Sequence, residues 1–197
     1  MRGDVTLPSV LASHMVIQRN RPVHVWGNAD PGEHITVAFR DHQGTAVADA
    51  LGRWGVYLPP GTAGGPFSLT IQGKNTVTLS DILVGDIWIA SGQSNMEFPM
   101  MNKGIFRGAL NMQQEISAAN YPKLRLFQAD HATSDYPMED VAAKTWTACS
   151  PQSVADFSAA AYFFGRELLE KEKVPIGLIE TDWGGTPAEA WTSLGAL

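Results

Sequence analysis

The sequence predicts two kinds of structure in succession: a β-sandwich-like domain over residues 1–83, then the first part of an α/β domain with a mostly parallel sheet over residues 84–197. Two observations lead to this prediction. The first part holds short runs of β-branched and aromatic residues between glycine- and proline-containing turns, with no long helical periodicity. In the second part, apolar strands alternate with amphipathic segments, which is typical of parallel strands covered by helices on both faces.

The strands of the first part follow from its turns. Short strand-like runs are expected at His34–Phe39, Gly52–Leu58 and Phe67–Gln72. The stretches DHQG, PPGTAGGP and GKN punctuate these runs with turn-forming residues. Strands of this length and spacing predict a small sandwich.

The strands of the second part are more apolar. DIWIAS, at residues 86–91, predicts a buried strand. A second strand is expected at Tyr121–Ala129, entered through a proline, and a third at Val174–Thr181. Three strands make a thin sheet, and the sequence stops at AWTSLGAL, inside a further expected helix. We therefore expect this chain to be part of a longer polypeptide.

The segment between the second and third of these strands predicts a strong amphipathic helix. Its apolar residues recur along one face, and its charged residues fall mainly on the other. The serine-x-x-acid pattern at Ser153–Asp156 predicts where this helix begins. A weaker helix is expected at Ile105–Ala119. The apolar face of the stronger helix consists of Phe157, Ala161, Phe164 and Leu168.

Composition excludes several classes of function. Apolar residues make up 44% of the chain and charged residues 17%, which indicates a globular protein. The formal charge of -6 argues against a nucleic-acid partner. No run of about 18 apolar residues is present, so no membrane span or membrane partner is expected. Cys149 is the single cysteine, and histidines and acids are not clustered at metal-ligand spacing, so we expect no disulfide, no metal and no cofactor.

Two turns in the second part predict a common site. After the first strand, Ser94 and Glu97 have the spacing of a capping box, and after the third strand Thr186, Pro187 and Glu189 form a helix-start pattern. The carboxyl ends of parallel strands meet at one edge of a sheet, where helix N-termini would present unpaired N–H groups. Acyl-transfer enzymes need such donors for an oxyanion. From the residues alone, Ser94 is either a nucleophile or a helix cap.

The sequence also resembles a known family. GDIWIASGQSNMEFPM resembles the first conserved block of the sialate O-acetylesterases, a branch of the SGNH-type hydrolases that removes acetyl esters from sugars. LPSVLASHMVIQRNRPVHVWGNADPGEHITVAF looks like the N-terminal β-domain of that family, and FSAAAYFFGRELLE and VPIGLIETDWGGTPAEAWTSL look like its later segments. The resemblance implies an SGNH-hydrolase-like fold for residues 84–197. It also implies an acetylated carbohydrate as substrate, either sialic acid or a polysaccharide, and a periplasmic or secreted location, although no signal segment is present.

The resemblance assigns roles to individual residues. It implies that Ser94 is the nucleophile, that it forms an acyl-enzyme, and that its N–H is an oxyanion donor. Gly184 and Gly185 match the second oxyanion element, and we expect Gly185 to be the donor. Trp183 is a candidate substrate contact, with packing as the alternative. Turn and capping preferences, and not the resemblance, lead us to expect Asp182 to be a turn or surface carboxylate and Glu97 to be a capping acid.

The family's QGES-type block and its aspartate-x-x-histidine block, which supplies the general base, are absent from this sequence. Serine needs a neighbouring base to act as a nucleophile. His131, beside Asp130, lacks the family spacing and is expected in a solvated loop. We therefore expect the base to come from the C-terminal remainder of the same enzyme, beyond Leu197, as a second chain or a missing segment.

Two alternatives stay open at this point. In the first, the protein is a non-catalytic glycan-binding protein that uses Trp26 and Trp54 of the β-domain as stacking residues. In the second, the chain is an inactive fragment of an esterase that carries only half of a catalytic site. Sugar binding that survives Ser94→Ala, while no ester is ever cleaved, would favour the first alternative.

Overall fold

The structure is a computed structural model that describes residues 4–193, 195 and 196. Its strands are β1 (Val16–Gln18), β2 (Val23–Asn28), β3 (His34–Phe39), β4 (His42–Val47), β5 (Arg53–Leu58), β6 (Gly64–Gln72), β7 (Thr76–Gly92), β8 (Tyr121–Gln128), β9 (Thr147–Cys149) and β10 (Ile176–Asp182). Its helices are α1 (Ser94–Glu97), α2 (Met112–Ala118), α3 (Pro151–Val154), α4 (Ala159–Glu172) and the 3-10 helix η1 (Ala188–Trp191). Leu194 and Leu197, in the last expected helix, lie outside the described residues.

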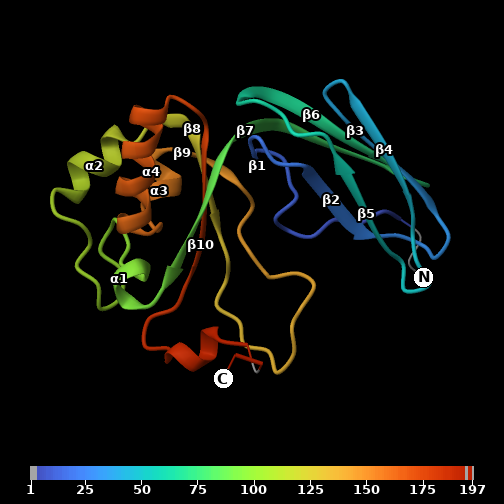
Figure 1. The fold of residues 1–197 in the computed structure, drawn as a ribbon. Coiled ribbons are helices and arrows are strands. Elements are labelled where there is room, and N and C mark those ends of the chain that lie inside the picture. Colours follow the sequence, from blue (N-terminus) through green and yellow to red (C-terminus); the bar gives the residue numbers. More distant parts are fainter. Residues whose placement is uncertain (1–3, 194, 197) are drawn as a thin grey trace.

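Strand β7 links the two halves of the chain. Its first half pairs antiparallel with β6, and its second half, Asp86–Gly92, pairs parallel with β10. The resulting mixed sheet has the order β4-β3-β6-β7-β10-β8-β9, with β1 also paired to β7. In Figure 1, β7 runs from the helical half of the molecule into the N-terminal strands. The predicted boundary at residues 83 and 84 falls within this strand, and the division into two domains stays a prediction.

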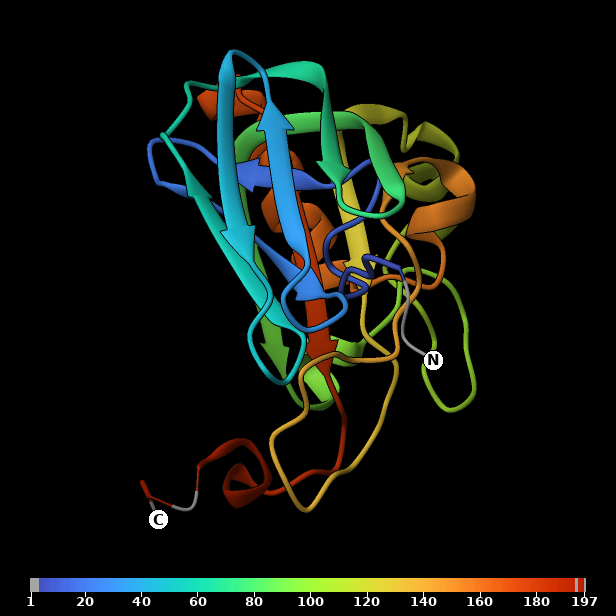
Figure 2. The ribbon, with the colours of Figure 1, turned by 90° about the vertical axis from the view of Figure 1, so that its right-hand side faces the viewer.

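The N-terminal strands share one hydrophobic core. Strands β2 and β5 form a two-stranded antiparallel sheet, and their inward side chains, such as Val25 and Val56, belong to the same buried cluster as Val37 of β3 and Ile71 of β6. Figure 2 looks onto these strands, with the orange helix α4 behind them. A separate β-sandwich is not confirmed, because β6 and β7 continue into the same hydrogen-bonded sheet as β10 and β8.

Helices α1 to α4 lie together on one side of β7, β8 and β10, whereas the 3-10 helix η1 lies apart near the C-terminus (Figure 1). Helix α4 approaches β10 closely, because a Cβ at Gly165 would lie 2.7 Å from Leu178 Cδ1. On the other face, Phe127 and Trp146 join the N-terminal core, whereas Ile89 is 70% exposed. The expectation of helices on both faces is therefore wrong for the described residues. What the structure has is a mixed sheet with parallel strands and few helices.

The predicted start of the strong helix at Ser153–Asp156 is also wrong. Ser150 caps the short helix α3 by accepting a hydrogen bond from the Ser153 N–H, and α4 begins later, where Ser158 Oγ accepts from the Ala161 N–H at 3.1 Å. The break between the two helices has a tertiary cause. The backbone of residues 155–159 hydrogen-bonds to the chain that follows α1, including Met100 N–H to Phe157 O at 3.1 Å.

The weaker predicted helix, Ile105–Ala119, is only partly present. Helix α2 covers Met112–Ala118 alone, and Gly104 and Gly108 adopt positive φ angles of 56° and 69°, which interrupt a right-handed helix. Ile105, the first residue of the predicted helix, is 93% exposed. Among the described helices, none has the length and apolar character that a membrane crossing requires.

Candidate active site

The ends of β7 and β10 bring the two predicted turns together. The strands are parallel neighbours, and Asp182 of β10 pairs in register with Gly92 of β7. The backbone N–H of Trp183, the next residue, donates to Gly92 O at 3.0 Å. The segment that begins with Gln93 and the segment that begins with Trp183 therefore leave the sheet side by side, as expected for parallel strands.

Ser94 lies against the glycine pair of the second turn. A Cβ added to Gly184 would lie 3.0 Å from Ser94 Oγ, so the two turns are in contact. Gly185 has a φ of +81°, in the left-handed region that favours glycine. Gln93 Nε2 donates to the carbonyl oxygen of Thr186, the residue after the two glycines, at 2.6 Å. This bond is a second connection between the two turns. Ser94 itself is exposed.

The capping interactions expected in these turns are not formed. Ser94 is the first residue of the four-residue helix α1, its N-cap is Gln93, and no side chain caps it. Thr186 likewise makes no cap; its Oγ1 donates to Trp183 O at 2.7 Å, and the 3-10 helix η1 follows. Helices of one turn carry little of the dipole that the sequence led us to expect at this edge. Donors here are individual backbone N–H groups.

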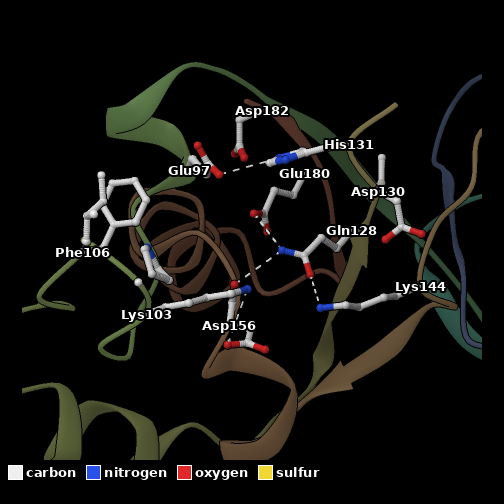
Figure 3. A pocket seen from close by; sticks show the side chains of 14 residues that line it. Glu97, Lys103, Phe106, Gln128, Asp130, His131, Lys144, Asp156, Glu180 and Asp182 are labelled. Atoms are coloured by element: carbon white, nitrogen blue, oxygen red, sulfur yellow. Dashed lines mark hydrogen bonds and ion pairs between the residues drawn. The ribbon is translucent and has the colours of Figure 1, made fainter. Parts of the chain in front are cut away.

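A cavity of about 450 Å³ opens beside this edge (Figure 3). Glu97, one helical turn after Ser94, lines it together with side chains from the ends of β8 and β10. Figure 3 shows Glu97, His131 and Asp182 near one another, and Lys103, Lys144 and Asp156 in another part of the cavity. The carboxylates that line the cavity are Glu97, Asp130, Asp156, Glu180 and Asp182, and the basic side chains are Lys103, Lys144 and His131.

Asp182 is buried, which corrects the expectation of a surface carboxylate. It is 5% exposed, and its Oδ2 has no hydrogen-bond partner among the described residues. Burial, followed by the charges of Glu180 and Glu97, raises the pKa of Asp182 to about 7. Burial also raises the pKa of Glu180, although Gln128 Nε2 donates to its carboxylate at 2.9 Å. This end of the cavity therefore holds a carboxyl group that titrates near neutrality.

His131 lies in an exposed loop, as the sequence predicted, and it also lines the cavity. Its ring stacks on that of Trp183, with the centroids 4.5 Å apart and the planes at 9°. Its Nε2 lies 3.7 Å from Glu97 Oε1. His131 comes shortly after the end of β8, at Gln128, and therefore reaches the same sheet edge. Its position just after a predicted strand was the sequence signal for a place in the site. Trp183 thus has a packing partner, and its role as a substrate contact stays a prediction.

The two tryptophans named for glycan stacking have different environments. Trp54 is 5% exposed and belongs to the N-terminal core. Trp26 is half-buried and stacks on His24, with ring centroids 4.8 Å apart, and His24 stacks in turn on the exposed Tyr57 at 4.2 Å. Within the described ranges, no group of three or more histidine, cysteine, aspartate or glutamate side chains is arranged to hold a metal ion.

Comparisons with known proteins show the family to which the chain is similar. The family model described as "Carbohydrate esterase, sialic acid-specific acetylesterase" matches residues 84–197. The chain is 33% identical to the sialate O-acetylesterase of Homo sapiens over 205 residues, which cover 94% of this chain and 38% of that protein. It is 33% identical to the sialate O-acetylesterase of Rattus norvegicus over 209 residues, covering 96% of this chain and 38% of that protein.

A solved structure of a carbohydrate acetylesterase has a similar fold. A carbohydrate acetylesterase from Xanthomonas citri superposes with a TM-score of 0.92 at 39% sequence identity. The match covers 98% of this chain and 43% of that one. The chain thus spans 38% of the length of the curated relatives named above, and its similarity to them runs through both the N-terminal strands and the candidate site.

Proposed function

The chain belongs to the family of carbohydrate esterases described as sialic acid-specific acetylesterases, and from this premise we propose that its protein removes O-acetyl groups from carbohydrates with Ser94 as the nucleophile. One observation carries the proposal: the glycine turn after β10 lies against Ser94, with a Gly184 Cβ position only 3.0 Å from Ser94 Oγ. A nucleophile beside a turn of backbone N–H groups is the arrangement that acyl transfer requires.

The proposed reaction has two steps. Ser94 Oγ attacks the carbonyl carbon of the acetyl ester, its proton passes to a general base, and the sugar hydroxyl leaves with a proton as the acyl-enzyme forms. Water then attacks the acetyl group on Ser94, releases acetate and restores the serine. In each step the carbonyl oxygen becomes an oxyanion, which the N–H groups of Ser94 and Gly185 would stabilise.

We propose that the general base comes from protein outside these 197 residues. The aspartate-x-x-histidine block that the family resemblance implies for this role is absent from the sequence. His131 is the alternative, because it lines the cavity beside Glu97. If the base is external, His131→Gln should lower kcat by less than roughly 10²-fold. A loss as large as that of Ser94→Ala would assign the base to His131.

Acetate release from an acetylated sugar by the complete protein, with the part that supplies the base, tests the proposal. Ser94→Ala should lower kcat by a factor on the order of 10⁶. Gly185→Ala should lower it by roughly 10²–10³, part of which reflects strain at a positive φ. Ser117→Ala, an exposed serine on α2, is the matched control and should keep the wild-type rate. Full turnover by the Ser94→Ala protein would refute the proposal.

The exposed stack of Trp26, His24 and Tyr57 favours glycan binding as a second candidate function. Aromatic faces on a sheet surface can pack against the apolar face of a sugar. The packing of β2 and β5 over β3 and β6 supports a β-sandwich-like unit as the carrier of this surface. The second function requires that sugar binding survive Ser94→Ala and be lost in Tyr57→Ala, while no ester is cleaved by the wild-type protein.

A further inference from the structure

Glu97 makes two contacts that a helix-capping acid does not make. Its Oε2 accepts a hydrogen bond of 2.5 Å from the backbone N–H of Gly184. Its Oε1 lies 3.7 Å from Nε2 of His131, as Figure 3 shows. The carboxylate therefore connects α1, the loop after β8 and the turn after β10. These segments follow three parallel strands of one sheet.

The turn after β10 is shaped to receive this carboxylate. A Cβ on Gly184 would lie 2.5 Å from Glu97 Oε2 and 3.3 Å from Ser94 Cα, so a larger residue would displace Glu97 or Ser94. Backbone bonding of Trp183 to Gly92 holds one end of the turn, and the Gln93 side chain holds Thr186 at the other. Glu97 is the contact that holds the glycines between these two ends.

The bond to Glu97 also determines which N–H can reach an oxyanion. Hydrogen bonds from N–H to an ionised carboxylate are roughly twice as strong as neutral ones, so the Gly184 N–H is already engaged. The N–H groups of Ser94 and Gly185 donate no hydrogen bond within the part of the chain that the structure describes. We propose that Glu97 is a positioning residue for the hydrolysis proposed above: it binds the Gly184 N–H and so presents the Gly185 N–H, beside Ser94, as the oxyanion donor.

His131 orients the carboxylate from the opposite side. Its ring is held flat on Trp183, the residue before Gly184, and its Nε2 faces Glu97. A second set of contacts of this kind restricts the rotamers of a positioning side chain, which is what a preorganised site requires. The inference depends on the proposed function, because a donor for an oxyanion has a purpose only if Ser94 carries an acyl group.

Steady-state kinetics of the complete protein, including the part that supplies the base, with 4-nitrophenyl acetate test this role. Glu97→Ala should lower kcat by roughly 10- to 100-fold, because a displaced donor is lost mainly in the transition state. KM should stay within about threefold for the same reason. Glu97→Gln keeps an oxygen that can accept from Gly184 and should return to within about fivefold of the wild-type kcat. Glu170→Gln, an exposed acid on α4, is the control and should match the wild type.

Hydrogen exchange supplies a readout that does not depend on turnover. The Gly184 amide should be protected in the wild type and in Glu97→Gln, and should exchange faster in Glu97→Ala. A wild-type kcat in Glu97→Ala, an unrescued Glu97→Gln, or unchanged exchange would each overturn the inference. A complete wild-type protein that neither hydrolyses the ester nor reacts at Ser94 with diethyl 4-nitrophenyl phosphate would instead refute the proposed function. In that case Glu97 would have no positioning role in catalysis. The exchange rate of the Gly184 amide would still show whether Glu97 holds Gly184.

Discussion

The difference in unfolding free energy between Asp182→Asn and the wild type should shift in favour of the variant as the pH rises from acidic to alkaline. The carboxyl group is 5% exposed and Oδ2 is unpartnered among the described residues. Burial first, and then Glu180 and Glu97, raise its pKa from 3.8 to about 7. Each pKa unit corresponds to about 1.4 kcal/mol, so ionising Asp182 in the folded protein costs up to about 4 kcal/mol.

The sign follows from proton uptake. Between pH 3.8 and about pH 7 the folded state keeps the Asp182 proton while the unfolded state has lost it, so the free energy of unfolding falls as pH rises through this window. Asparagine carries no charge and removes this contribution. The advantage of Asp182→Asn over the wild type should therefore grow by about 2 to 3 kcal/mol between pH 5 and pH 8.

Urea denaturation followed by tryptophan fluorescence at these two pH values measures the difference. Asp130→Asn provides the matched control, because Asp130 lines the same cavity but is exposed. The control should leave the pH dependence as it is in the wild type. An equal difference in stability between Asp182→Asn and the wild type at both pH values would refute the argument from burial.

Three further predictions concern the scaffold. Gly85→Ala should lower the unfolding free energy by about 2 kcal/mol or more, because the new Cβ would lie 1.9 Å from Pro175 O; an unchanged melting temperature would contradict this. Burial raises the pKa of Cys149 to about 12, so Ellman's reagent should modify it only as fast as the protein unfolds, and rapid modification would contradict its burial. Arg125→Ala should lower the free energy of unfolding in urea titrations by roughly 3 kcal/mol, since buried Arg125 pairs with Asp81 at 2.7 Å. A loss below about 1 kcal/mol would show that the pair contributes no more than a surface ion pair.

Strands were predictable from the sequence where one local signal dominates. The run His34–Phe39 is strand β3 with the expected bounds, because its alternation of buried and outward residues matches the pleat. The length of β7 was not predictable, because its two halves pair with different partners in different senses. Periodicity describes the faces of a strand and carries no information about which neighbours it meets.

The site was predictable in outline and not in its contacts. Adjacent parallel strands explain why Ser94 and Gly184 meet, and the glycine turn gave the signal. The spacing of Ser94 and Glu97 favoured a local cap, but Glu97 binds Gly184 instead, a partner 87 residues away that only the folded chain supplies. The burial of Asp182 was invisible for a similar reason, since it depends on the packing around the end of β10.

The most direct test of the account is to identify the residue that carries the acetyl group during turnover. The complete protein, with the part that supplies the base, is mixed with 4-nitrophenyl acetate, quenched in acid and digested, and the peptide that contains Ser94 is examined by mass spectrometry. We predict an acetyl group on Ser94 that appears during turnover and is absent from the Ser94→Ala protein. Turnover with Ser94 unmodified, or undiminished turnover by Ser94→Ala, would contradict the assignment of Ser94 as the nucleophile.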